Sequence, residues 1–225
     1  MKAIIFDLYE TLITEWGRPR YLARDAAIYL DVDHQLFQQE WDALGRDRFL
    51  GKYAKVEDVL KKILDNLSID RDEQLLIEIA QKRARYKQTC FDVIEPKIID
   101  MLSSLKAEGY KIGLISNCSP EEVGGLQDCE LYTYLDAVVL SCDVGMEKPD
   151  TEIYDYCLSL LGENASDCYF VGDGGSDELS GAERAGMIPL RALWFIKYFA
   201  ENFDLNNSYK SFYEPEELLE YVKMM

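Results

Sequence analysis

Several features that would point to particular kinds of protein are missing from this chain of 225 residues. Its six cysteines form no CxxC pair, so neither a zinc knuckle nor a redox pair of that kind is indicated. No apolar run approaches the ~20 residues that a bilayer-spanning helix needs. At the N-terminus only four apolar residues precede Asp7, which is too short for a secretion signal. A cytoplasmic location is therefore expected.

Basic residues are scarce as well. The chain has 24 lysines and arginines against 42 acidic residues, and its formal net charge is −18. Such a charge repels nucleic acid and anionic membrane surfaces unless a local basic patch overrides it, and the sequence shows none, so neither is expected as a partner. The densest basic stretch, 82–87, has helical spacing and is predicted to form a solvated helix face.

The cysteines are scattered along apolar stretches, which favours reduced and mostly buried thiols. Cys118 follows a motif described below and could be an active-site thiol, but a packing role is favoured. The only histidine, His34, is expected at the surface.

What the sequence does contain is a series of short apolar runs, most of them ending in an acid or another polar group. They predict buried strands over 2–7, 111–116, 137–142, 168–173 and 188–193. Helical periodicity separates them and also closes the chain, at 98–108, 121–126, 151–161, 178–185 and 216–223. This alternation predicts an α/β fold with a doubly wound parallel sheet that helices cover on both faces.

The region 15–91 interrupts the alternation directly after the first strand. It contains no convincing strand, and four amphipathic helices are predicted there, over 21–30, 35–46, 56–67 and 72–89. We expect residues 15–91 to form a smaller, all-helical cap domain. The core domain would then consist of residues 1–14 and 92–225.

Potentially reactive side chains stand where four of the predicted strands end. They are Asp7, then Ser116 with Asn117, then Asp143 with nearby Lys148, and finally Asp173 with Asp177. In an open parallel sheet, ligands bind beyond the carboxyl ends of the strands. We therefore expect these groups to meet at one edge of the sheet.

These residue types suit covalent catalysis by a carboxylate, with Asp7 as the attacking group. If the electrophile is phosphorus, charge on its oxygens must be neutralised. Lys148 can supply a fixed positive charge and Ser116 a hydroxyl. Mg²⁺ prefers a hard site of carboxylate and water oxygens, which Asp7, Asp173 and Asp177 could supply.

Four segments together resemble the motifs of the haloacid dehalogenase superfamily. Segment 6–12 (FDLYETL) is similar to the first motif, 114–117 (LISN) to the second, 148–149 (KP) to the third and 171–177 (VGDGGSD) to the fourth. Each is a weak signal alone, but the four occur in the right order and strand context. The resemblance spans almost the whole chain, including a helical cap between the first two motifs.

The resemblance implies a role for each matching residue. It implies that Asp7 is the nucleophile, that Thr11 and Ser116 orient it and the transferring group, and that Lys148 holds nucleophile and substrate together. As a donor at a strand end, Asn117 is by position a further candidate ligand of the phosphate. The resemblance also implies a Mg²⁺ site formed by Asp7, Asp173, Asp177 and the backbone carbonyl of Tyr9.

The chain departs from the family's phosphatases at Tyr9, where these carry a second aspartate as general acid and base. A phenol with an ordinary pKa near 10 is a poor general base near neutrality. Three explanations stay open: a cap residue supplies the acid and base, the leaving group is a good one, or the reaction is not phosphate hydrolysis.

The haloacid dehalogenase branch itself resembles this chain at Tyr9 and Tyr154, and those enzymes need no metal. By periodicity alone, however, Tyr154 is more often a core residue than a ligand. Those enzymes also lack the acidic metal ligand that Asp173 supplies here, and they typically have glycine where this chain has Glu10. Asp173 and Asp177 therefore favour a magnesium-dependent phosphatase.

A third reading is a catalytically weak regulatory or ligand-binding protein.

The expected function is hydrolysis of a small phosphorylated metabolite through an aspartyl-phosphate at Asp7, with Mg²⁺ as cofactor. The start of the predicted cap, with Trp16, Arg18, Arg20 and Tyr21, leaves the expected site and could touch the substrate. The sequence identifies neither the substrate nor the oligomeric state.

Overall fold

The computed structural model describes residues 2–198 and 209–224, and its centre is a six-stranded parallel sheet in the order β3-β2-β1-β4-β5-β6. The strands are β1 (Ala3–Phe6), β2 (Lys111–Ser116), β3 (Ala137–Leu140), β4 (Cys168–Gly172), β5 (Ile188–Ala192) and β6 (Ser211–Phe212). The chain enters at the middle of the sheet and winds outward in both directions. This is the predicted doubly wound α/β fold.

The central position of β1 follows from its composition. All four of its residues are buried, and it pairs with β2 on one side and β4 on the other. Because both faces of the sheet are covered, a continuous apolar run is stable there. Asp7 comes directly after this run, so the topology places its carboxylate near the middle of the sheet's carboxyl edge.

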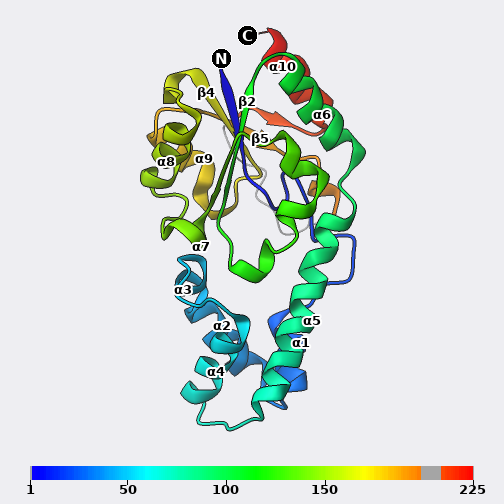
Figure 1. The fold of residues 1–225 in the computed structure, drawn as a ribbon, viewed down its shortest axis with the longest axis vertical. Helices are drawn as coiled ribbons and strands as arrows, with labels where there is room; N and C mark the ends of the chain where they lie inside the picture. The colour runs from blue at the N-terminus through cyan, green and yellow to red at the C-terminus, as the bar shows by residue number, and fades with distance from the viewer. Residues whose placement is uncertain (1, 199–208, 225) are drawn as a thin grey trace.

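Helices cover both faces of the sheet (Figure 1). α6 (Pro96–Ala107) and α10 (Pro215–Met224) share one apolar cluster with Ile4 and Phe6 of β1. α8 (Thr151–Leu161) and α9 (Glu178–Arg184) share a second cluster with Ala3 and Ile5. The alternation of side chains along β1 therefore divides the core between the two faces.

Five helices lie between β1 and α6 in the sequence and gather beyond the carboxyl edge of the sheet (Figure 1). They are α1 (Ala23–Tyr29), α2 (His34–Ala43), α3 (Gly45–Phe49), α4 (Val56–Asn66) and α5 (Glu73–Asp92). Many of their apolar side chains, among them Phe37, Trp41, Leu60 and Ile63, form a cluster separate from the two on the sheet, whereas Cys90 and Phe91 at the end of α5 belong to the cluster that contains Ile4 and Phe6. Within the described residues none of the helices is long and apolar enough to cross a membrane.

Both α5 and α3 contact the part of the chain that forms the sheet and its covering helices. α5 packs against the short 3-10 helix η1 (Pro120–Glu122), and α3 packs against α7 (Ser141–Val144). Just after α3, the backbone at Gly51 has φ +73°, and a Cβ atom there would lie 2.0 Å from the carbonyl oxygen of Cys142. Only glycine permits this close approach.

Some sequence predictions differ from the structure, among them the single helix predicted over 35–46, which is divided into α2 and α3. The helix predicted over 121–126 is replaced by short 3-10 turns, because Pro120 and the glycines at 124 and 125 interrupt it. The strand predicted to reach Cys142 ends at Leu140, and α7 begins at the next residue. The two-residue strand β6 is too short to predict from the sequence. The basic stretch 82–87 is not simply a solvated face, since Arg83 is buried and Lys87 is half-buried.

Candidate active site

Asp7 and Lys148 form the centre of the candidate site. The backbone N–H of Asp7 donates to the carbonyl of Val171 at 2.8 Å. This hydrogen bond continues the β1–β4 pairing and holds Asp7 at the strand end. Lys148 Nζ donates to Asp7 Oδ1 and to Glu178 Oε2. All three side chains are buried; Lys148 is 4% exposed. The ammonium group is therefore held between two carboxylates and excluded from water.

The loop that carries Lys148 is fastened to the end of β2. Asn117 Nδ2 donates to the carbonyl of Lys148 at 2.8 Å, and the backbone N–H of Lys148 donates to Asn117 Oδ1, also at 2.8 Å. Ser116, 1% exposed, is the last residue of β2. Asn117 thus positions Lys148, in addition to the substrate contact expected from the sequence.

A cavity of about 190 Å³ lies at this edge of the sheet. Its lining comes from the ends of β1, β2 and β4 and from the Lys148 loop: Asp7, Tyr9, Glu10, Ser116, Asn117, Lys148, Asp173, Gly175, Ser176 and Glu178. The structure therefore brings the predicted strand-end residues to one place, with Asp143 and Asp177 outside this lining.

Asp173 and Glu178 complete a group of carboxylates with Asp7. Asp173 Oδ1 accepts a hydrogen bond from the N–H of Gly175 at 2.9 Å, and Glu178 Oε1 accepts one from Gly174 at 3.2 Å. One carboxylate oxygen from each of the three acids lies within 4.8 Å of the others. Hard oxygen donors at this spacing suit a magnesium ion.

The charge balance of the site also favours a cation. Three carboxylates share this buried volume with the Lys148 ammonium group, and the buried guanidinium of Arg191 donates to the backbone carbonyl of Asp173 at 3.0 Å, so the acids still outnumber these two cations. Burial, together with the charge of Asp7, raises the pKa of Asp173 to about 6 and that of Glu178 to about 8. Burial alone would lower the pKa of Lys148, but Asp7 and Glu178 outweigh it and raise it. A divalent cation would neutralise the excess negative charge.

The sequence predicts Asp177 as a metal ligand, but the third acid of this group is its neighbour Glu178. The side chain of Asp177 is 72% exposed and lies 4.0 Å from Arg184. Its backbone has φ +53°, so the chain turns there before α9 begins at Glu178, whose side chain is 1% exposed. Two acids stand side by side in the sequence, and only the geometry of this turn shows which one faces inward.

Tyr9 lines the cavity, but its hydroxyl is engaged elsewhere. The phenol donates to the carbonyl of Glu122 at 2.6 Å, and burial and the nearby Glu122 carboxylate raise its pKa. It is therefore unsuited to accept or release a proton near neutrality. Thr11, fully buried, has its hydroxyl 3.5 Å from Asp7 Oδ2, in a position to orient that carboxylate.

Glu10, noted in the sequence only as a departure from glycine, also lines the cavity. Its backbone has φ +60°, the left-handed conformation that glycine adopts most easily. The hydroxyl of Thr14 and the N–H of Glu15 donate to its carboxylate, and burial raises its pKa to about 7. Glu10 therefore fastens the loop that follows β1.

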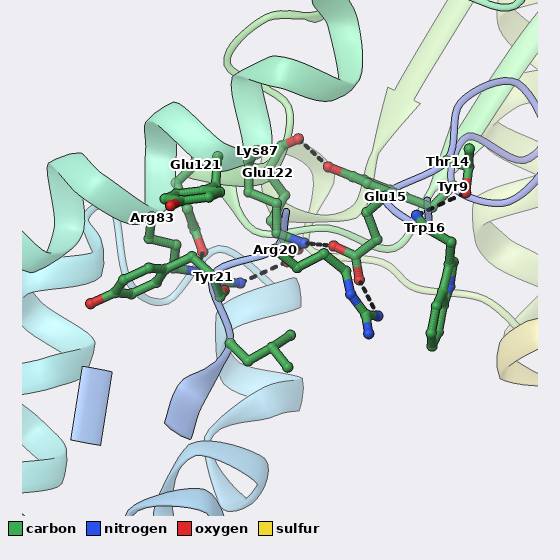
Figure 2. A network of polar contacts seen from close by, with 12 residues as sticks. Tyr9, Thr14, Glu15, Trp16, Arg20, Tyr21, Arg83, Lys87, Glu121 and Glu122 are labelled. Atoms are coloured by element: carbon green, nitrogen blue, oxygen red, sulfur yellow. Dashed lines mark hydrogen bonds and ion pairs between the residues drawn. The ribbon is translucent and has the colours of Figure 1, made fainter. Parts of the chain in front are cut away.

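A buried network of charges joins α5 to the segments around Tyr9 (Figure 2). Arg83 pairs with Glu121 at 3.1 Å and with Glu122 at 2.9 Å. Lys87 pairs with Glu122 at 3.1 Å and with Glu15 at 2.8 Å, and it lies 5.1 Å from the centre of the Tyr9 ring. The prediction of a solvated helix face was wrong for Arg83 and Lys87, because their partners come from loops distant in the sequence.

The residues at the start of the predicted cap are tied to this network. The guanidinium of Arg20 stacks on the Trp16 ring at 3.7 Å and lies 3.9 Å from Glu15. Arg18 donates to the carbonyl of Thr89, and the carbonyl of Tyr21 accepts a hydrogen bond from Arg83 at 3.1 Å. These contacts fix the segment 15–21 beside the site.

The remaining residues singled out from the sequence lie outside the cavity lining. Tyr154 is buried against Phe170, with ring centres 5.2 Å apart, and donates to the carbonyl of Glu178 at 2.7 Å. It therefore supports Glu178 from the core. His34 is exposed at the start of α2, as predicted. Cys118 is buried directly behind Asn117.

The fold and the site together define a doubly wound α/β protein with a buried carboxylate and lysine at the carboxyl edge of its sheet. The family model for haloacid dehalogenase-like hydrolases matches residues 1–186. The chain therefore belongs to the haloacid dehalogenase-like hydrolase family. The resemblance found in the four motifs is confirmed.

Known relatives extend over most of the chain. A glyceraldehyde 3-phosphate phosphatase of Methanothermobacter thermautotrophicus is 29% identical over 192 residues, 83% of this chain and 83% of that protein. A phosphoglycolate phosphatase of Aquifex aeolicus is 28% identical over 196 residues, 86% of this chain and 85% of that protein. A 2-haloacid dehalogenase structure from Pseudomonas syringae pv. Tomato DC3000 has a TM-score of 0.69 at 20% identity, with 100% and 99% of the two chains covered. At this identity the likeness concerns the fold.

Proposed function

We propose that this protein is a magnesium-dependent phosphatase that hydrolyses a small phosphorylated metabolite through an aspartyl-phosphate at Asp7. The carboxylate group of Asp7, Asp173 and Glu178, with oxygens within 4.8 Å, is the observation that carries the proposal. Such a group of acids around one lysine is costly to bury unless a cation compensates it. Relatives at 28–29% identity that are phosphatases support this choice.

The proposed reaction uses the geometry around Asp7. One carboxylate oxygen of Asp7 attacks phosphorus, the bond to the leaving oxygen breaks, and water then hydrolyses the aspartyl-phosphate. Lys148, already bonded to Asp7, holds a phosphate oxygen close to the nucleophile, and Ser116 donates its hydroxyl to another. Mg²⁺ held by Asp7, Asp173 and Glu178 would supply further neutralisation of the phosphate charge.

The size and surroundings of the cavity favour a small substrate. Its volume of about 190 Å³ accommodates a phosphate and a few further atoms. We assign residues 15–91 to a cap domain and residues 1–14 and 92–225 to the core. Side chains from the cap would then close over the cavity and select the substrate.

Metal-independent dehalogenation of a 2-haloacid is the second candidate, and the Tyr9 ring in the cavity lining favours it. The buried carboxylate of Asp173 counts against it, because without a metal an anionic substrate would be repelled by the excess of carboxylates in the site. A chain with this fold but little activity is the third reading.

The test compares the natural chain with Asp7→Asn on a panel that includes p-nitrophenyl phosphate, phosphoglycolate, glyceraldehyde 3-phosphate and 2-chloropropionate. We expect phosphate release that needs Mg²⁺ and falls at least about a thousandfold in Asp7→Asn. Phosphate release that survives this change would refute the role of Asp7. Halide release in the presence of EDTA would establish the dehalogenase instead, and no turnover of any compound would favour the third reading.

A further inference from the structure

Two thiols meet directly behind the candidate site. Cys118 Sγ lies 3.9 Å from Cys142 Sγ, although the two residues are 24 positions apart in the sequence. Cys118 follows Asn117 at the end of β2, and Cys142 lies on α7, a few residues before Lys148. The backbone joins them as well, since the N–H of Cys118 donates to Ser141 Oγ at 2.9 Å.

The two cysteines differ in exposure. Cys118 is fully buried, whereas Cys142 is only partly buried. Cys142 also contributes to the wall of a second cavity, of about 420 Å³, between η1 and the edge strand β3. A small solute can therefore reach Cys142 without entering the site around Asp7. Cys118 is buried and lies behind Cys142.

We infer that Cys118 and Cys142 form an oxidation site, in which a small hydroperoxide converts the two thiols into a disulfide. The thiolate of Cys142 attacks a peroxide oxygen, the O–O bond breaks, and a sulfenic acid and one water or alcohol molecule form. Cys118 sulfur then attacks Cys142 sulfur, and the hydroxyl leaves as water with the proton of Cys118. The thiols lose two electrons and two protons, which the peroxide takes up.

The charge state of the two thiols agrees with this order of events. The contact with Cys118 lowers the pKa of Cys142 and outweighs the opposing effect of the Asp143 carboxylate, 3.8 Å from Cys142 Sγ, so Cys142 is the readier thiolate. The same contact and its own burial raise the pKa of Cys118, which keeps its proton until the second step. The other described cysteines have no thiol neighbour within hydrogen-bonding distance.

Disulfide formation would disturb the site through Asn117 and Lys148. The sulfurs must approach from 3.9 Å to a bond length of about 2.05 Å, which draws the segment after β2 toward α7. Asn117, next to Cys118, holds both backbone groups of Lys148. α7 is also pressed against Gly51 and has little room to yield. Oxidation would therefore displace Lys148 and slow turnover.

The test treats the reduced full-length protein with hydrogen peroxide and measures intact mass and linked peptides. We expect the loss of two hydrogen atoms, a peptide pair joined through Cys118 and Cys142, and reversal by dithiothreitol. Cys142→Ser, at a position with room for the hydroxyl, should form no such link. The matched control Cys129→Ser, which removes a thiol that donates to the Leu126 carbonyl and has no hydrogen bond to another thiol among the described residues, should form it normally.

The effect on turnover rests on the proposed function, but the disulfide does not. With a phosphatase substrate, we expect oxidation to lower activity about tenfold to a hundredfold in the natural chain and in Cys129→Ser, and to spare Cys142→Ser. A protein without phosphatase activity would refute the proposed function. The mass measurement would still decide whether Cys118 and Cys142 form a disulfide. Oxidation of Cys142 to sulfinic acid without a link to Cys118, or equal loss of activity in Cys142→Ser, would overturn the inference.

Discussion

Glu178 has two partners of opposite kind at the candidate site. It shares Lys148 with Asp7, and its carboxylate also belongs to the group of acids suited to a cation. A buried carboxylate in this position is stable only if the surrounding charges compensate it. Asp177, one residue earlier, points to solvent and has no such constraint.

This contrast gives a matched pair of substitutions. We expect Glu178→Gln to weaken Mg²⁺ binding at least about tenfold, because a neutral amide is a poorer ligand and removes one of the three negative charges that attract the cation. Asp177→Asn should change it less than about twofold, since its side chain is exposed and outside the cluster. Isothermal titration with MgCl₂ measures both. Equal effects of the two substitutions would show that the metal does not bind where the three acids converge.

The position of the site could be predicted from sequence, but not its full membership. Asp7, Lys148 and Asp173 follow or flank buried strands, and parallel topology alone brings such positions to one edge. The choice between Asp177 and Glu178 depends on two left-handed backbone conformations at Ser176 and Asp177. No residue pattern specifies these conformations, so the sequence could not show that the carboxylate of Glu178 would join those of Asp7 and Asp173. The roles of all these residues stay predictions.

At the scale of elements, α5 is attached to the sheet domain by charge rather than by apolar packing alone (Figure 2). Arg83 and Lys87 lie one helical turn apart and pair with Glu121 and Glu122 of η1. Burial alone would raise the pKa of Glu122, but the two cations lower it to about 2. The same segment accepts the hydroxyl of Tyr9, so the attachment of α5 is continuous with the wall of the cavity.

Removing Arg83 should therefore destabilise the fold strongly. We expect Arg83→Ala to lower the free energy of unfolding by about 3 kcal/mol, because Glu121 and Glu122 lose their buried partner. Arg85→Ala on the same helix removes an exposed arginine and should cost less than about 0.5 kcal/mol. Urea unfolding followed by circular dichroism measures both. A loss in Arg83→Ala no larger than in Arg85→Ala would mean that the network contributes nothing to stability.

Elements were easier to predict from sequence than their contacts. The apolar runs at β1, β2 and β4 indicated strands because each is buried on both faces. Helical spacing correctly indicated that 72–89 is helical, but it does not reveal a partner more than 30 residues away. For this reason Arg83 was expected in solvent, whereas its partner Glu121 lies 38 residues further along.

At the scale of the whole molecule, several buried acids make the fold sensitive to pH. The pKa values of Asp173, Glu10 and Glu178 are raised to about 6, 7 and 8, in each case chiefly by burial. In the unfolded chain these groups have ordinary values near 4. Between about pH 5 and pH 8 the metal-free folded protein thus binds more protons than the unfolded chain, so its stability falls as pH rises. The lowered pKa of Glu122 acts in the opposite direction, but only below about pH 4.5.

Magnesium should remove much of this pH dependence, because a cation at Asp7, Asp173 and Glu178 favours the charged carboxylates that protons neutralise. In EDTA, we expect the free energy of unfolding to be lower at pH 8 than at pH 6, by an amount on the order of 2 kcal/mol. With saturating MgCl₂ the difference should shrink, and the stabilisation by the metal should be larger at pH 8. Glu178→Gln serves as the control, since a neutral side chain should flatten the profile in EDTA. A metal-free protein that is more stable at pH 8 than at pH 6 would contradict the assignment of excess buried negative charge to this site.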